Sequence, residues 1–407
     1  MNRQRSSIIV LTVLAASMRA ASAGAQGEPV QDHYHNLHIE VADPDPTVKE
    51  PEATFNLYGA LWFNYSMQLW QPTTVDKYAN FEFSQLHIAF DASWHGFSVM
   101  TELRIFSSLL LIRQAWLQYA WKDNAIQVGQ IHVPWGREPF SSESWWFSLG
   151  WYTTFGEDYS YGFKYIKDNE NYRLDVAYVV RDNFGLLEPT SRWSADLTPE
   201  GEQQNREFSS LAARGIYKLH HREELLTEFA LSGQVGLLNN AATNANGYRW
   251  AAAATYTGNY DGWAPLVQVT RYEFRPNNPA LIDGTAVDDR VVRLSQLGAF
   301  RDLAALAWLF NFNLSKMIEI NRKILKALVP YLNYSWVLKD EGAFANSQLI
   351  TPGIQVRMGP VWVWFDMIMG KNATFLNDTL AQSGVGPGAV RPYRFEYRPN
   401  LQLQYYF

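Results

Sequence analysis

The chain has 407 residues, a net charge of −6, no cysteine and 15% aromatic residues. The lack of cysteine excludes disulfides, thiolate metal sites and cysteine nucleophiles, and the acidic balance argues against a general affinity for nucleic acid. Its 16 Trp, 22 Tyr and 23 Phe are unusually many, and the boundary between lipid and water is one place where such side chains are stable.

Residues 1–25 have the pattern of a secretory signal peptide. Basic Arg3 and Arg5 precede an apolar run over residues 8–16, and small residues then offer cleavage after Ala23 or Ala25. An uncleaved membrane anchor is the alternative, but the run is far shorter than the ~20 residues that a spanning helix needs. We therefore expect an exported protein from which this segment is removed.

Residues 26–52 are rich in proline and acidic residues, which predicts a flexible periplasmic N-terminal extension. The extension contains His33, His35 and His38. A metal site is the alternative, but ligands on a flexible segment lack the surrounding contacts that hold coordination geometry. We predict no metal and no cofactor, and the extension is a candidate docking arm for a periplasmic partner.

From Thr54 onward, apolar and polar residues alternate with a period of two, the pattern of strands with one apolar and one polar face. The same pattern recurs over 172–181, 225–235 and 361–369. A soluble β-sandwich would also alternate, but these runs are longer and more aromatic than soluble strands, which average ~5–6 residues. We predict an all-β fold in which residues 53–407 form a closed transmembrane antiparallel β-barrel.

Short polar or Gly/Pro turns alternate with long connections along the barrel sequence, as in outer-membrane barrels with short periplasmic turns and long external loops. Both termini should lie in the periplasm, so the strand count must be even. Assigning 290–300 to an external loop gives sixteen strands, with eighteen as the alternative. A barrel of this size leaves a water-filled lumen. The long connections are 71–79, 134–157, 182–206, 236–246, 275–302, 339–347 and 371–391.

The last strand ends in alternating apolar and aromatic residues, Leu401, Leu403, Tyr405 and Phe407. This ending resembles the C-terminal assembly signal that the barrel insertion machinery recognises. We therefore expect the chain to lie among the lipids of the bacterial outer membrane.

Residues 134–157 are the richest in aromatic, charged and proline residues, and we predict that they fold inward as a pore constriction. An external loop packed on its neighbours is the alternative. The sequence contains no G-x-S-x-G, H-E-x-x-H or phosphate-loop motif, so we do not expect an enzyme. The candidate constriction residues are Arg137, Glu138, Glu143, Trp145 and Trp146.

Alternation also assigns charges to the lumen, where basic residues outnumber Glu102, Asp175, Glu228, Asp366 and Glu396. A cationic wall favours the passage of anions. The alternative is that these charges pair along and across strands. The predicted lumen-facing basic residues are Arg104, Lys164, Arg173, Arg181, Arg214, Lys218, Arg357, Arg394 and Arg398.

The blocks VPWGREPFSSESWWF and GEDYSYGF and the segment 315–335, together with the terminal Phe, resemble the phosphate-selective porin O and P family. The resemblance implies a sixteen-stranded, trimeric channel for small hydrophilic solutes. The dense arginine ladder of phosphate-selective relatives is not evident here, so we expect a porin with weak anion preference and phosphate as one candidate solute. The alternatives are a structural or scaffolding barrel for a partner complex and, less favoured, an outer-membrane hydrolase.

Overall fold

The computed structural model describes residues 53–137, 141–182, 190–222, 225–376, 384–388 and 394–407. The signal peptide and the N-terminal extension, predicted for residues 1–52, therefore lie outside the described residues, as does the candidate constriction residue Glu138. The first described strand, β1 (Thr54–Ser66), begins where the alternating pattern of the sequence begins.

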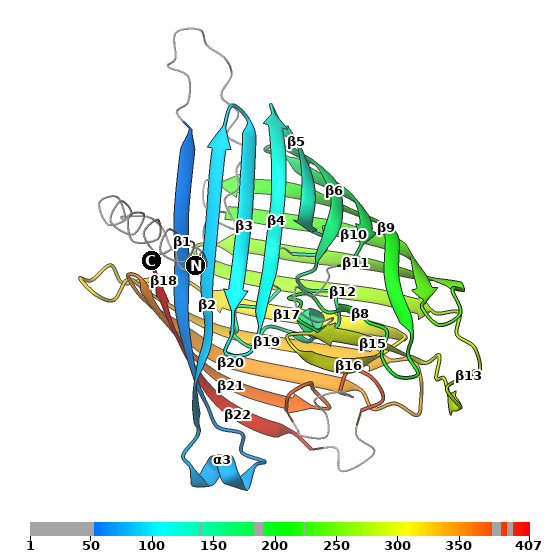
Figure 1. The fold of residues 1–407 in the computed structure, drawn as a ribbon. Coiled ribbons are helices and arrows are strands. Elements are labelled where there is room, and N and C mark those ends of the chain that lie inside the picture. Colours follow the sequence, from blue (N-terminus) through cyan, green and yellow to red (C-terminus); the bar gives the residue numbers. More distant parts are fainter. Residues whose placement is uncertain (1–52, 138–140, 183–189, 223–224, 377–383, 389–393) are drawn as a thin grey trace, which may run out of the picture.

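Sixteen long antiparallel strands form one closed barrel (Figure 1). Each strand pairs with the next along the chain, and the last pairs with the first, from Ala60 opposite Tyr406 to Ser66 opposite Asn400. Closure removes free sheet edges, so every strand finds backbone partners on both sides. The predicted fold class and strand number are confirmed. After β1 come β2 (Asn80–Trp94), β3 (Phe97–Ile105), β4 (Leu110–Trp121), β5 (Asn124–His132), β6 (Tyr159–Asp168), β7 (Tyr172–Arg181), β9 (Asn205–Arg222), β10 (Leu225–Asn240), β11 (Asn246–Tyr260), β12 (Trp263–Arg275), β17 (Leu306–Lys316), β19 (Ala327–Lys339), β20 (Ser347–Met358), β21 (Val361–Lys371) and β22 (Glu396–Tyr406).

Tight turns join strands at one end of the barrel. Gly96, Gly262 and Gly359 adopt positive φ in the turns after β2, β11 and β20, a conformation that glycine reaches without steric penalty. The chain ends at this short-turn end, where the Tyr406 amide donates to the Pro360 carbonyl at 2.9 Å. The two-residue strand β18 (Ile318–Glu319) pairs with β19 beside the same end.

The opposite, long-loop end carries the remaining elements, including the exposed hairpin of β13 (Leu281–Ile282) and β14 (Thr285–Ala286). The stretch 290–300, which we assigned to a loop, is not a barrel strand. It forms a separate three-stranded sheet, the inner sheet, made of β8 (Asp196–Leu197), β15 (Val291–Gln296) and β16 (Ala299–Ala304).

The described helices are short: α3 (Pro72–Asp76) lies between β1 and β2, and α4 (Leu149–Tyr152) between β5 and β6. Within the part of the chain that the structure describes, we find no helix long and apolar enough to cross a membrane.

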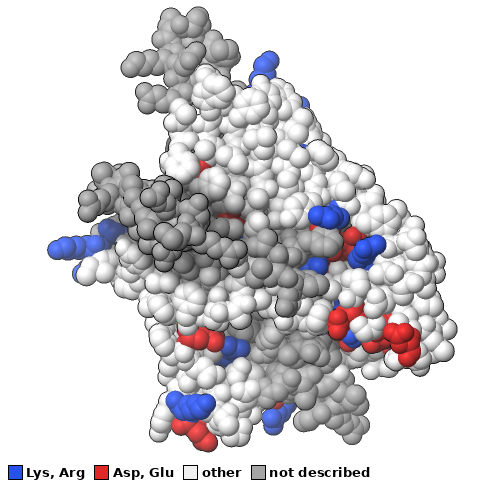
Figure 2. All heavy atoms as spheres, in the orientation of Figure 1, with Lys and Arg blue, Asp and Glu red and all other residues white. Residues whose placement is uncertain are grey.

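The barrel exterior is apolar and aromatic, and the interior face of the same strands is polar. On β22, Tyr405 is 48% exposed whereas its neighbour Gln404 is 1% exposed. Phe407, Leu401 and Leu403 also lie on the outward face, as the alternation of the last strand predicts. Figure 2 shows that much of the visible side of the barrel lacks charged side chains, which gather toward its ends. This surface suits acyl chains, and the barrel is a transmembrane one.

The interior is more densely packed than the predicted water-filled lumen. A buried apolar cluster joins Trp135, Leu149 and Phe155 of the β5–β6 connection to wall residues such as Tyr272, and the inner-sheet residue Leu294 belongs to the same cluster. The strand count alone predicts an open lumen because it takes no account of connections that fold back inside. Here these connections cover a large part of the described inner wall.

Candidate functional site inside the barrel

The β5–β6 connection, residues 133–158, is called the inner segment here. Its first half contacts one side of the wall: the Gly136 amide donates to Ser232 Oγ of β10 at 3.0 Å, and the Arg137 amide donates to Gln268 Oε1 of β12 at 3.2 Å. Arg214 of β9 donates from Nη1 to the Gly136 carbonyl at 3.1 Å. Gly136 has a φ of +50°, and a Cβ there would lie 2.1 Å from Gln268 Oε1. The positive φ therefore favours glycine at this position.

The second half of the inner segment contacts another part of the wall. The Glu143 amide donates to Asn313 Oδ1 of β17 at 3.2 Å, and Trp364 of β21 donates from Nε1 to the Glu143 carbonyl at 3.2 Å. Ser144 Oγ donates to Asp366 Oδ1 at 3.1 Å. The segment thus makes polar contacts with β9, β10 and β12 near its start and with β17 and β21 further along.

The two candidate tryptophans lie where the barrel closes. The Trp145 ring meets Trp62 of β1 edge to face, with centroids 4.8 Å apart. The guanidinium carbon of Arg398 on β22 lies 4.4 Å from the centre of the Trp146 ring. The described candidates Arg137, Glu143, Trp145 and Trp146 therefore all belong to a segment that contacts inward-facing side chains, although they do not form one compact cluster.

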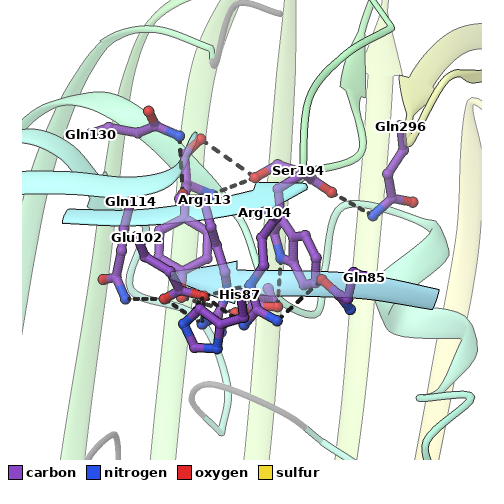
Figure 3. A network of polar contacts seen from close by, with 12 residues as sticks. Gln85, His87, Glu102, Arg104, Arg113, Gln114, Gln130, Ser194 and Gln296 are labelled. Carbon is purple, nitrogen blue, oxygen red and sulfur yellow. Dashed lines mark hydrogen bonds and ion pairs between the residues drawn. The ribbon is translucent and has the colours of Figure 1, made fainter. Parts of the chain in front are cut away.

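A buried polar network fixes the wall beside the inner segment (Figure 3). At its centre the fully buried Glu102 carboxylate accepts hydrogen bonds from Arg104 Nε at 2.6 Å, Arg113 Nη1 at 2.8 Å and Gln114 Nε2 at 2.9 Å. His87 Nε2 lies 3.4 Å from the same carboxylate. A buried carboxylate is tolerated when cations and donors surround it in this way.

The network extends from the wall to the inner segment through Glu157. Arg113 Nη2 donates to Glu157 Oε1, and Trp193 donates from Nε1 to Glu157 Oε2 at 2.7 Å. Tyr159 Oη also donates to Glu157 at 2.8 Å, and the Arg104 guanidinium carbon lies 5.0 Å from the Trp193 ring centre. Arg113 therefore joins the wall, the end of the inner segment and the stretch before the inner sheet.

Replacement of this arginine should destabilise the barrel strongly. Arg113→Met leaves the Glu102 and Glu157 carboxylates buried without their shared cation. We expect a loss of roughly 3–5 kcal/mol in the free energy of unfolding, the usual effect of removing one partner of a buried ion pair. Urea unfolding followed by tryptophan fluorescence measures it. Adding Glu157→Gln to Arg113→Met should recover part of the loss, and equal stability of the two variants would contradict this role.

Several of the predicted lumen-facing basic residues pair with carboxylates. Arg214 Nη2 lies 2.6 Å from Asp175 Oδ2, Arg173 Nε lies 3.0 Å from Asp175 Oδ1, and Lys218 Nζ lies 2.6 Å from Asp168 Oδ1. Arg104 pairs with Glu102 and Arg394 with Glu396 in the same manner. The alternative reading of the sequence, in which charges pair along and across strands, therefore describes these five basic residues.

Other predicted basic residues on the inner wall also contact neutral groups. Lys164 Nζ donates to the His132 carbonyl at 3.0 Å, and Arg398 Nη2 donates to Ser66 Oγ at 2.9 Å. The Arg357 guanidinium carbon lies 4.3 Å from the centre of the Trp362 ring. These cations remain candidates for contact with a permeating anion.

Arg181 departs from its predicted inward position. The pairing of β6 and β7 shifts register between Tyr161 and Gly162, so Arg181 lies opposite Tyr161 while Gly162 pairs with Val179. Arg181 is exposed, and its guanidinium carbon lies 5.4 Å from the Tyr161 ring centre. A bulge of one residue turns every following side chain to the other face, which is why strict alternation placed Arg181 wrongly.

The sequence analysis did not identify some residues that lie in the interior. Arg113 faces inward on β4, but a register shift between Glu102 and Leu103 disturbs the alternation opposite it. Trp193 and Arg301 lie in long connections, for which alternation makes no statement. No group of three or more His, Asp or Glu in the described ranges is arranged to hold a metal ion.

A second polar group, the acidic cluster, lies at the long-loop end and consists of Asp158, Asp182, Asp196 and Glu207. All four are buried, and Arg192 Nη1 lies 3.2 Å from Asp182 Oδ2 and 3.6 Å from Asp196 Oδ2. Burial, with the nearby Glu207 carboxylate, raises the pKa of Asp158 to about 7 and that of Asp182 to about 7. Burial also raises the pKa of Asp196 well above its ordinary value.

No known family model and no curated protein sequence matches this chain. Solved structures do resemble it in fold. An anion-selective porin from Comamonas acidovorans aligns with a TM-score of 0.56 at 11% identity, over 88% of this chain and 100% of the other. The outer membrane channel DcaP of Acinetobacter baumannii gives 0.53 at 14% identity, over 87% and 97%. OmpT, an outer membrane protein of Vibrio cholerae in a trimer form, gives 0.51 at 12% identity, over 88% and 100%.

The likeness identifies the fold as that of outer-membrane porins. Together with the apolar exterior of a closed antiparallel barrel, it places this chain in the bacterial outer membrane. The narrower resemblance of the sequence motifs to the phosphate-selective porin O and P family stays a prediction, since no family model matches.

Proposed function

We propose that this protein is an outer-membrane porin through which small hydrophilic solutes diffuse passively, with a weak preference for anions. The observation that carries the proposal is the reversal of polarity across one closed sheet. Outward side chains such as Tyr405 are apolar and exposed, while inward ones such as Gln402 and Asn333 are polar and buried from lipid. A barrel with this arrangement offers a polar route through a hydrocarbon layer.

Within this proposal the inner segment is the constriction. It carries Arg137, Glu143, Trp145 and Trp146, and its contacts with β10 and β12 near the start and with β17 and β21 further along support a position across the interior. Solutes would pass beside it, since the apolar cluster around Leu149 fills one region of the interior.

The charge arrangement supports a weak selectivity and not a strong one. Carboxylates neutralise Arg104, Arg173, Arg214 and Lys218, so these residues add little net field. Arg357 and Arg398 have no carboxylate within 4 Å among the described residues, so these two cations are best placed to attract an anion. Phosphate is one candidate solute. By analogy, the anion-selective porin of similar fold supports a preference for anions.

Single-channel recording tests the proposal. Purified barrel in a planar bilayer should give steady conductance, and in a KCl gradient the reversal potential should indicate anions passing more readily than potassium, by about twofold. The matched measurement with an Arg357→Gln/Arg398→Gln variant should move the reversal potential toward zero. A reversal potential that indicates cation preference would contradict the anion proposal but not the porin.

The packed interior favours one second candidate, a structural or scaffolding barrel for a partner complex. The apolar cluster resembles a folded core more than a channel lining. A silent bilayer from verified folded protein, with co-purification of a periplasmic partner in mild detergent, would establish that candidate. The sequence has no G-x-S-x-G or H-E-x-x-H motif, which argues against a hydrolase. Lipid and ester substrates that stay intact after incubation with the barrel would exclude this activity.

We also propose a homotrimer that is delivered to the outer-membrane lipids by the insertion machinery. The outward row Leu401, Leu403, Tyr405 and Phe407 at the chain terminus supports recognition by that machinery, and the trimer form of the similar fold supports the oligomeric state. Cross-linking in native membranes, with a trimer band as the expected result, tests the second point.

A further inference from the structure

Arg301 of β16 is a buried cation with no carboxylate partner among the described residues. Its side chain is 1% exposed, and neither Nε nor Nη1 has a hydrogen-bond partner. No carboxylate in the described residues lies within 4 Å of its guanidinium group. Burial lowers the pKa of Arg301 to about 10, so the side chain still carries its charge at neutral pH. Because an isolated buried charge is unfavourable, it calls for a bound anion.

Aromatic rings surround the Arg301 guanidinium group. Its central carbon lies 5.5 Å from the Tyr152 ring centre and 5.4 Å from the Phe375 ring centre. Tyr152 and Phe375 meet edge to face with centroids 5.9 Å apart, and Tyr152 Oη donates to the Trp146 carbonyl at 3.2 Å. The π-electrons of both rings attract the cation. The rings accept no hydrogen bond in the plane of the guanidinium group, so its N–H donors stay available to a ligand at the edge of that plane.

A second arginine completes the group. Arg398 is 9% exposed, lies over the Trp146 ring, and leaves Nε without a partner. The Tyr152 ring contacts Arg301, and its hydroxyl donates to the carbonyl of Trp146, the residue whose ring lies under Arg398, so Tyr152 connects the two arginines. We call Arg301, Arg398, Tyr152, Trp146 and Phe375 the arginine–aromatic cluster. It joins the inner sheet, β22, the inner segment with α4, and the stretch after β21.

We propose that the arginine–aromatic cluster is a binding site for an oxyanion, the carboxylate or phosphate group of a small solute. A planar guanidinium group binds such oxygens in its plane through two parallel hydrogen bonds, and the rings beside it exclude water and strengthen the interaction. The proposal deepens the proposed porin function by naming the solute class, but binding can be measured without conduction.

Isothermal titration of the full-length barrel in detergent, with acetate and with inorganic phosphate as separate probes, tests the site. We expect saturable binding of at least one probe, accompanied by a change in tryptophan fluorescence because Trp146 lies over Arg398. Arg301→Met should weaken binding by at least about tenfold, the effect of losing charge-assisted hydrogen bonds. Arg301→Lys, which keeps the positive charge but lacks the planar guanidinium group, should bind the anion with intermediate affinity.

The matched control is Arg290→Met, because Arg290 is an exposed loop arginine that pairs with Asp288; it should bind as the unchanged protein does. Folding is checked separately: Arg301→Met removes an unpaired buried charge and should raise the melting temperature in anion-free buffer. An affinity of the Arg301→Met variant equal to that of the unchanged protein, or no binding of either probe to folded protein, would overturn the site. A silent bilayer with intact anion binding would instead overturn the porin alone.

Discussion

Replacing residues 141–152 of the inner segment by a short Gly-Ser linker is expected to raise the single-channel conductance of the barrel by at least about twofold. This stretch contains Trp145, Trp146 and the α4 helix, and it contributes Leu149 to the interior apolar cluster. The replacement keeps the anchors at both ends, namely Gly136 against Ser232 and Glu157 against Arg113. Conductance in a planar bilayer measures the effect.

The matched control for this change is removal of the β13–β14 hairpin, residues 281–286. That hairpin also lies at the long-loop end but is largely exposed and pairs only with itself among the described residues. Its loss should leave the conductance unchanged. If the two deletions have the same effect, or if the linker variant conducts no better than the unchanged barrel, the inner segment does not limit the passage of ions.

Raising the pH should loosen the attachment of the inner sheet at the acidic cluster. Burial is the main cause that raises the pKa values of the Asp158 and Asp182 carboxyls to about 7, from an ordinary value of 3.8. A raised pKa in an acid means that folding favours the protonated form. The stabilisation is therefore complete below about pH 4 and is lost as the pH rises through about pH 7.

Each carboxyl contributes on the order of a few kcal/mol to this slope, since one unit of pKa is about 1.4 kcal/mol. Urea unfolding at pH values from about 5 to about 9 should show stability falling with pH. The Asp158→Asn/Asp182→Asn variant, which cannot ionise at these positions, should give a flatter profile and greater stability at the alkaline end. A variant profile as steep as that of the unchanged protein would show that other groups set the dependence.

The acidic cluster also shows why its behaviour cannot be read from the sequence. Asp158 precedes β6, Asp182 follows β7, and Asp196 belongs to the inner sheet. Each alone looks like an ordinary loop carboxylate. Only the folding of the β7–β9 connection against the wall brings them together and removes them from water, and that removal is the main cause of their raised pKa values.

The sequence by itself determined the barrel. Strict alternation over long runs, turn residues such as Gly262 and Gly359, and an apolar row ending at Phe407 depend only on neighbours along the chain. Strand side chains point alternately to opposite faces, so the pattern specifies which face meets lipid. An even strand count and closure follow from the same pattern, because an open edge cannot be satisfied in hydrocarbon.

Tertiary structure decided what fills the barrel. Bulges beside Arg113 and Arg181 change the facing of charged residues by one position, and alternation cannot reveal where an extra residue is inserted. The inner segment and inner sheet find their places through contacts with strands far away in sequence, such as that of Glu143 with Asn313. Arg301 becomes a buried cation with no carboxylate partner among the described residues only through this packing, since burial and pairing belong to the folded interior and not to any local run of residues.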